Sequence, residues 1–267
     1  MKITFIGAGN MATAIIKSIL NSGKISPDSI CVFDKFSDKA EVFSSLGVNV
    51  SKTLEDACNF GDTVLLAVKP QDYESLLCDV KNLTRDLSEK LIISIAAAIS
   101  CGYICKMLEC DCPVIRIMPN TPVLLGMGAI AISRNEFVND KVYSKVCSLF
   151  ASCGVVCCLD EELMNKVICV NGSSPVFVYM MAKAMIDKGI EYGISEKNAT
   201  ELALHTIKGS VEMLIKSGKT PDELISQVAS PGGTTLAAIS SMQDDGFYEL
   251  MNKAMDACTK RADELSK

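Results

Sequence analysis

The opening stretch, MKITFIGAGNMATAII, constrains the fold more than any other part of this chain. An apolar run, Ile3 to Ile6, stops at the GxGxxA motif of residues 7–12, and an apolar helical pattern follows at once. In such a motif the first glycine permits a tight turn, the second lets the backbone approach a pyrophosphate, and the small third residue lets helix and strand pack closely. The helix start also offers free N–H groups to phosphates. The motif predicts a dinucleotide site, with a ligand-free tight turn as the alternative.

Short β-like runs alternate with helical stretches as far as about residue 160, which is typical of βαβ units. The expected strands cover residues 2–6, 30–33, 48–50, 63–67, 91–95, 114–118, 127–132 and 155–159. Helices are expected at 11–22, 38–46 and 72–80, and beyond 160 the pattern is helical only, with a long helix over 161–192 interrupted near Gly172–Pro175. We therefore expect an α/β protein with a Rossmann-type domain at 1–160 and an all-helical domain at 161–267.

Composition excludes several function classes. The net charge is −6, which does not favour nucleic acid as a partner. No apolar run reaches the roughly 20 residues that span a bilayer, so we expect no membrane association and a cytoplasmic location. Thirteen cysteines with one histidine and no CxxC pair predict free thiols in a reducing cell rather than a metal site or a disulfide framework. The thiols are then small buried residues.

Asp34, at the end of the second expected strand, indicates which nicotinamide cofactor the site prefers. An acidic residue there usually accepts hydrogen bonds from the adenosine ribose and disfavours a 2′-phosphate, which slightly favours NADH over NADPH. Lys35, Ser37 and Lys39 could instead pair with that phosphate, and Asp34 could simply cap the next helix.

Two further loops should lie at the same edge of the sheet, where ligands bind in open α/β folds. One is Ala67-Val68-Lys69-Pro70, after the fourth strand, and the other follows the fifth strand at Ala96. Small residues there leave room for a nicotinamide ring.

A stretch in the helical region, Ser230-Pro231-Gly232-Gly233-Thr234-Thr235, is richer in glycine and hydroxyl groups than an interhelical turn requires. At a helix start, it exposes several N–H donors and two hydroxyls, which suit a carboxylate. An ordinary turn is the alternative.

Taken together, FIGAGNM, AVKPQ, SIAA, RIMPNTP, NGSSP and SPGGTT resemble, in order and over nearly the whole chain, the pyrroline-5-carboxylate reductases. The resemblance implies reduction of 1-pyrroline-5-carboxylate to L-proline with NADH or NADPH, and a helical domain that forms a homodimer, which can assemble into a ring of dimers (a decamer).

The resemblance also assigns the site residues. Thr235 would hydrogen-bond the ring nitrogen. The other substrate-binding residues would be Ser230, Gly232, Gly233, Thr234, Asn120 and Ser173. The cofactor would contact Ile6, Gly7, Ala8, Gly9, Asn10, Met11, Asp34, Lys35, Ala67, Val68, Lys69, Pro70 and Ala96. The chain departs from the family pattern at Ala98, where the family has glycine, and at Ser174, Val176 and Phe177, where it has Gly, Ala and Tyr.

Two other function classes compete with this one. In β-hydroxyacid dehydrogenases a catalytic lysine precedes an asparagine by four residues, one helical turn, but Lys166 and Asn171 are five apart. This spacing favours a solvated lysine. A non-enzymatic nucleotide-binding protein would not need the SPGGTT hydroxyls. His205, alone in a helical pattern, is expected to be a packing or interface residue.

Overall fold

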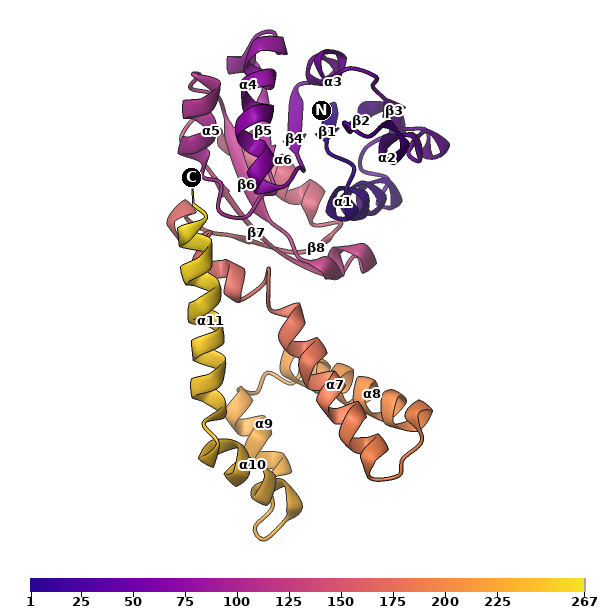
Figure 1. Cartoon of the computed structure of the whole chain (residues 1–267), viewed down its shortest axis with the longest axis vertical. Helices are drawn as coiled ribbons and strands as arrows, with labels where there is room; N and C mark the ends of the chain where they lie inside the picture. The colour runs from indigo at the N-terminus through magenta and orange to yellow at the C-terminus, as the bar shows by residue number, and fades with distance from the viewer. Residues whose placement is uncertain (267) are drawn as a thin grey trace. The chain divides into compact units, whose positions relative to one another are not determined.

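The computed structural model describes residues 1–266 (Figure 1). Its contacts divide the chain into two compact units. The first is Met1–Ser173 together with the chain from Cys258 onward, and the second is Ser174–Ala257. The division into domains after residue 160 stays a prediction.

The first unit is built on one sheet of eight strands in the order β3-β2-β1-β4-β5-β6-β7-β8. The strands are β1 (Ile3–Ile6), β2 (Ile30–Phe33), β3 (Asn49–Val50), β4 (Thr63–Leu66), β5 (Leu91–Ser94), β6 (Val114–Met118), β7 (Gly128–Arg134) and β8 (Gly154–Cys158). The first six are parallel, β7 runs antiparallel to β6, and β8 is parallel to β7. The order 3-2-1-4-5-6 is that of dinucleotide-binding sheets, which confirms the predicted fold.

Apolar side chains cover both faces of the central strands β1, β4, β5 and β6, which explains why these strands are continuous hydrophobic runs rather than alternating ones. Phe5 belongs to a cluster on one face with Ile15 of α1 (Asn10–Asn21) and Phe150 of α6 (Asp140–Phe150). Its neighbour Ile6 belongs to the cluster on the other face, with residues of α3 (Leu54–Phe60), α4 (Tyr73–Leu83) and α5 (Cys101–Leu108). Figure 1 shows these helices on the sheet. Because β1 to β6 are parallel, their carboxyl ends lie at the same edge of the sheet.

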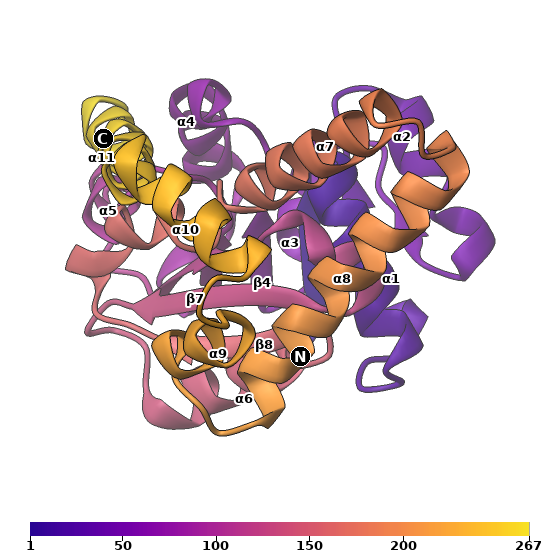
Figure 2. The ribbon, with the colours of Figure 1, turned by 90° about the horizontal axis from the view of Figure 1, so that it is seen from below.

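The second unit consists of helices, as predicted for this part of the chain. They are α7 (Pro175–Glu191), α8 (Glu196–Lys216), α9 (Pro221–Val228), α10 (Thr234–Asp244) and the first part of α11 (Phe247–Glu264), whose last residues belong to the first unit. Figures 1 and 2 both draw α7 and α8 side by side. Within residues 1–266, no helix is both long and apolar enough to cross a bilayer.

Two expected helices are wrong. Residues 38–46 form α2 (Ser37–Glu41) and a separate 3₁₀ turn, η2 (Ser44–Leu46), because the Ser44 hydroxyl donates to the Glu41 carbonyl. Residues 161–174 form two 3₁₀ turns, η6 (Glu161–Leu163) and η7 (Lys166–Cys169), and α7 begins only at Pro175, whose fixed φ suits a first turn. The remaining 3₁₀ turns are η1 (Pro27–Ser29), η3 (Pro70–Asp72), η4 (Leu87–Glu89) and η5 (Thr121–Leu125).

Candidate cofactor and substrate site

A cavity of about 560 Å³ lies at the carboxyl ends of β1, β2 and β4. Most of the predicted cofactor residues line it, namely Ile6, Gly7, Gly9, Asp34, Lys35, Ala67, Val68 and Lys69. Of the others, Ala8, Asn10 and Pro70 are neighbours of lining residues in the chain, Met11 is the second residue of α1, and Ala96 follows β5 and is buried. The structure thus brings together three loops that are far apart in the sequence.

Gly7 is the glycine that the fold itself requires. Its φ is +104°, outside the range that residues with side chains normally adopt. A Cβ there would lie 2.7 Å from the Ala67 carbonyl oxygen, and the Gly7 N–H donates to the Phe33 carbonyl at 2.7 Å. Gly7 therefore lets β1, β2 and β4 converge.

Gly9 is different, because a Cβ there would meet no protein atom within 4 Å. It is the N-cap of α1, and no side chain caps that helix. The first N–H groups of α1 are thus left for a ligand, as in phosphate-binding helix starts. Packing does not explain the missing side chain, whereas close approach of a pyrophosphate does.

Asp34 binds the glycine-rich loop directly. One carboxylate oxygen accepts from the Ala8 N–H at 2.8 Å, and the other accepts from the Phe36 N–H at 2.9 Å. The second contact is a turn rather than a helix cap, because the N-cap residue of α2 is Phe36 itself. Each oxygen keeps lone pairs for a further donor such as a ribose hydroxyl.

Two lysines and an aromatic ring stand beside Asp34. The ammonium groups of Lys35 and Lys39 lie 5.4 and 4.9 Å from the centre of the Phe36 ring, which is itself 56% exposed. Sequence reasoning missed Phe36, together with the lining residues Phe33, Leu54, Gln71, Asp72, Ser75, Leu76 and Asp79. An aromatic residue two positions after the acidic residue that follows a strand is the signal that could have found Phe36.

The loop after β5 contains a strained residue. Ala98, which stands where the family has glycine, has a φ of +64° and is 2% exposed. Below the loop the buried Tyr73 hydroxyl donates to the Leu66 carbonyl at 3.0 Å and lies 2.8 Å from the Ser94 hydroxyl. Burial raises the pKa of Tyr73, so this phenol stays protonated.

Asn120, predicted to bind substrate, makes two contacts within the first unit. Its side-chain oxygen accepts from the Ala129 N–H at 2.9 Å, and its amide nitrogen donates to the Asn171 carbonyl at 3.2 Å. Asn171 donates in turn to the carbonyls of Met118 and Ala129. These bonds join the end of β6 to the start of β7.

Lys166 does not share the surroundings of Asn171, because the lysine is exposed and the asparagine is 7% exposed. This supports a solvated lysine rather than the lysine–asparagine pair of a hydroxyacid dehydrogenase. Ser173 is half-buried, and the Cys258 thiol donates to its hydroxyl at 3.3 Å. His205 is exposed on α8, so it does not pack in the interior of its own unit.

Arg116, of the RIMPNTP stretch, is 3% exposed. It donates to the Asn165 side-chain oxygen at 2.6 Å and lies 3.8 Å from Glu161. Burial lowers the pKa of Arg116, an effect that Glu161 opposes. Asn165 also donates to Asp263 and Ser266, which ties the end of α11 to β6.

In the second unit the Ser230–Thr235 segment ends at the start of α10. Gly232 has a φ of +73°, and the Gly233 N–H donates to the Ser230 carbonyl at 3.0 Å. A Cβ on Gly233 would come within 2.4 Å of the Ser230 hydroxyl oxygen. No side chain caps α10, whose first two residues are Thr234 and Thr235, so no side-chain acceptor takes its first N–H groups. Thr235 also lines a mostly apolar cavity of about 690 Å³ within this unit.

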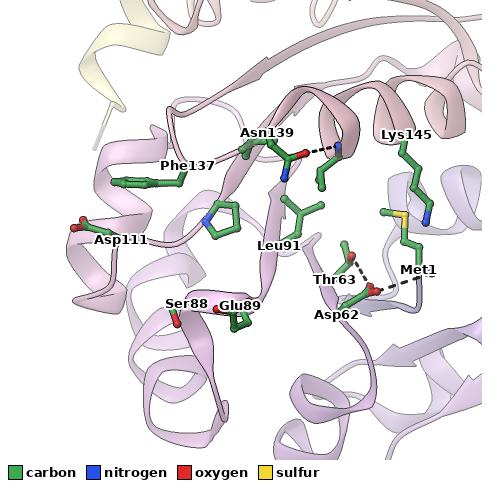
Figure 3. A pocket seen from close by; sticks show the side chains of 13 residues that line it. Met1, Asp62, Thr63, Ser88, Glu89, Leu91, Asp111, Phe137, Asn139 and Lys145 are labelled. Carbon is green, nitrogen blue, oxygen red and sulfur yellow. Dashed lines mark hydrogen bonds and ion pairs between the residues drawn. The ribbon is translucent and has the colours of Figure 1, made fainter.

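A cavity of about 500 Å³ lies at the opposite edge of the sheet (Figure 3). Thr63 and Leu91, which line it, are the first residues of β4 and β5, and Asp62 there is 3.9 Å from the terminal amino group of Met1. Ligands of open α/β folds bind at the carboxyl edge, so this cavity is not the cofactor site. Among residues 1–266, no three His, Cys, Asp or Glu side chains are grouped to hold a metal ion.

Comparison with known proteins agrees with this architecture. The family described as "Pyrroline-5-carboxylate reductase dimerisation" matches residues 161–265, and "NADP oxidoreductase coenzyme F420-dependent" matches residues 2–98. The pyrroline-5-carboxylate reductase of Escherichia coli is 32% identical over 100% of this chain and 98% of its own length, and that of Arabidopsis thaliana is 33% identical over 99% and 95%.

Solved structures point the same way. The Plasmodium falciparum pyrroline carboxylate reductase with NADP bound superposes with a TM-score of 0.91 at 29% identity, covering 100% of this chain and 98% of that one. The pyrroline-5-carboxylate reductase of Coxiella burnetii gives a TM-score of 0.90 at 30% identity, with coverage of 100% and 98%. The chain therefore belongs to the family of the pyrroline-5-carboxylate reductases, oxidoreductases that use NAD(P)H to reduce 1-pyrroline-5-carboxylate to L-proline.

Proposed function

We propose how this NAD(P)H-dependent reductase uses its residues. The nicotinamide cofactor binds at the carboxyl edge of β1, β2 and β4, and the substrate binds on the Ser230–Thr235 segment. The open space at Gly9, beside the uncapped start of α1, carries the cofactor half of this proposal. The pyrophosphate takes the N–H groups of α1, and Val68 and Lys69 border the rest of the cofactor.

Asp34 and its neighbours set the cofactor preference. The lone pairs of Asp34 that the Ala8 and Phe36 amides leave unused accept from the ribose hydroxyls, which slightly favours NADH. Lys35 and Lys39, both on the Phe36 ring, give NADPH a place for its 2′-phosphate. We therefore expect both cofactors to work.

The substrate carboxylate takes the hydroxyl of Ser230 and the N–H group of Thr234, at the positive end of α10. Gly232 and Gly233 shape the turn that presents them, and the Gly233 N–H is bonded to the Ser230 carbonyl. Thr235 hydrogen-bonds the ring nitrogen and holds the imine carbon in place. When bound, NAD(P)H supplies the hydride. A protonated imine is already electrophilic, so the protein needs to position it and exclude water rather than supply a strong base. Asn120 and Ser173 are proposed as further substrate-binding residues.

We further propose that the chain works as a homodimer and that dimers assemble into a decamer in the cytoplasm. The match of residues 161–265 to the dimerisation family supports self-association. The surface of α7 supports it too, since Val178, Tyr179, Met180 and Met181 are consecutive and each at least 42% exposed. A helix that is apolar on all sides belongs in an interior.

Steady-state oxidation of NADH and of NADPH with 1-pyrroline-5-carboxylate tests these roles. Thr235→Ala should lower kcat/KM at least about tenfold while leaving cofactor affinity unchanged, because it removes one hydrogen bond at the reacting atoms. Ser240→Ala, an exposed serine further along α10, is the matched control and should match the unmodified enzyme. Unchanged turnover in Thr235→Ala would remove this threonine from the reaction.

A further inference from the structure

Two thiols of the first unit lie in van der Waals contact, away from the cofactor and substrate residues. The Cys147 and Cys158 sulfurs are 3.8 Å apart. Cys147 lies in α6, and Cys158 is the last residue of β8. We infer that Cys147 and Cys158 form a reversible oxidation site, at which a hydroperoxide converts the two thiols into an intrachain disulfide.

The geometry suits a bond between these residues. A disulfide needs a sulfur separation of about 2.05 Å, so the sulfurs must approach by roughly 2 Å. Rotation of each cysteine side chain about its own Cα–Cβ bond moves its sulfur toward the other. Cys158 is exposed and Cys147 is half-buried, so an oxidant can reach one of the two directly.

The other cysteines lack this combination of proximity and access. Cys105 also lies close to Cys112, but Cys112 is 0% exposed and the Cys105 sulfur contacts the Asn135 amide. Cys157 precedes Cys158 on the same strand and is exposed, but successive side chains of a strand point to opposite faces. Cys157 therefore points away from α6.

The reaction balances with one equivalent of hydroperoxide. The Cys158 thiolate attacks the peroxide oxygen, which gives a sulfenic acid and an alcohol, or water from hydrogen peroxide. The Cys147 thiolate then attacks the Cys158 sulfur, the S–O bond breaks, and the oxygen leaves as water. Both thiols are oxidised and the peroxide is reduced, and a small dithiol reverses the change.

The surroundings of Cys147 control how fast this happens. Burial, reinforced by Cys158, raises the pKa of Cys147 to about 11, while Arg134 opposes the shift. Tyr143 faces both thiols, and burial, Cys158 and Cys147 raise the pKa of its phenol, so it stays neutral between pH 7 and 9. Little Cys147 is thiolate at pH 7, so the disulfide should form faster at pH 9 than at pH 7.

The bond would fix an edge of the sheet. β8 is the last strand in the sheet order and pairs only with β7. A disulfide to α6 links this edge strand to the helix that packs on it. Cross-linking lowers the entropy of the unfolded chain, so the oxidised protein should melt several degrees higher than the reduced one.

Peptide mapping of the intact protein under non-reducing conditions is the test. After treatment with hydrogen peroxide and blocking of free thiols, we expect one Cys147–Cys158 cross-link per chain, reversed by dithiothreitol. Cys147→Ser and Cys158→Ser should each abolish this cross-link and the rise in melting temperature, whereas Cys157→Ser, the matched control, should retain both.

The same measurements can overturn the inference. Peroxide treatment that leaves Cys147 and Cys158 unlinked in the unmodified protein would do so, as would a cross-link that appears only between other cysteines. Because mapping is performed on the unmodified chain, the result holds even where a serine variant fails to fold. Activity is not the readout, so the outcome is independent of the roles proposed for Thr235 and Asp34.

Discussion

Gly7 is required by the fold, whereas Gly9 leaves space for the cofactor. Substituting each by alanine should therefore affect stability and cofactor binding differently. A methyl group at Gly7 would meet the Ala67 carbonyl and the φ of +104° would be strained, so Gly7→Ala should cost more than about 2 kcal/mol of unfolding free energy. Gly9→Ala meets no protein atom and should cost less than about 1 kcal/mol. It should nevertheless weaken cofactor binding at least about tenfold, because the methyl occupies space needed by the pyrophosphate.

Urea unfolding without cofactor and fluorescence titration with NADPH separate the two effects. Equal cofactor affinity in Gly9→Ala and the unmodified enzyme would contradict the proposed pyrophosphate position.

Ala98 has a left-handed backbone conformation at the position where the family pattern has glycine, so its substitution measures the cost of that conformation. Ala98→Gly removes a buried methyl, worth about 0.8 kcal/mol, but also relieves a left-handed conformation that costs a residue with a side chain about 1–2 kcal/mol. The net change in unfolding free energy should stay within about 1 kcal/mol. Ala14→Gly, in α1 and equally buried at 2%, should lose about 2 kcal/mol. Thermal and urea unfolding compare the two, and equal losses would show that Ala98 is unstrained.

At the scale of elements, the Arg116–Asn165 contact ties the end of α11 to the sheet. Asn165→Ala removes the hydrogen-bond acceptor of the buried Arg116 and the two hydrogen bonds to Asp263 and Ser266. It should lower the free energy of unfolding by about 2 kcal/mol. It should also speed amide hydrogen exchange in residues 258–264. Arg261→Ala breaks only an exposed pair with Glu264 on the same helix and should cost less than about 0.5 kcal/mol. Similar hydrogen-exchange rates in residues 258–264 of the two variants would show that Asn165 does not hold the end of α11 to the sheet.

At the scale of the whole molecule, the exposed apolar surface of α7 is expected to be covered by a second copy. Met181→Glu would place a charge in that interface and should weaken self-association roughly 100-fold, since burying an unpaired polar group costs about 3 kcal/mol. Ser45→Glu adds the same charge to an exposed position of the first unit and should not change assembly. Sedimentation equilibrium measures both, and unchanged association of Met181→Glu would place the interface elsewhere.

Short-range patterns in the sequence were enough to predict most elements. The predicted bounds of β2 and β6 agree with the structure, and the ends of the other strands are each displaced by at most two residues. Their apolar runs mark burial on both faces, and glycine or proline marks their ends, so the information is local. The GxGxxA motif and the SPGGTT segment could also be found from the sequence. Each lies at the start of a helix, and the residues that form that start are adjacent in the chain.

Contacts between distant residues were decided only by the tertiary structure. Asp34 contacts Ala8 through a pairing of β1 and β2. Arg116 donates to Asn165, 49 positions further along the chain, and Asn165 donates in turn to Asp263 and Ser266. Residues 161–174 were predicted to be helical from their pattern, yet they turn tightly where Asn165 and Asn171 bond to the sheet. The sequence by itself determined the strands, the glycine-rich turn and the family, because propensity and turn chemistry act over a few residues. Partners of buried polar groups depend on which strands lie side by side, and only the folded chain sets that.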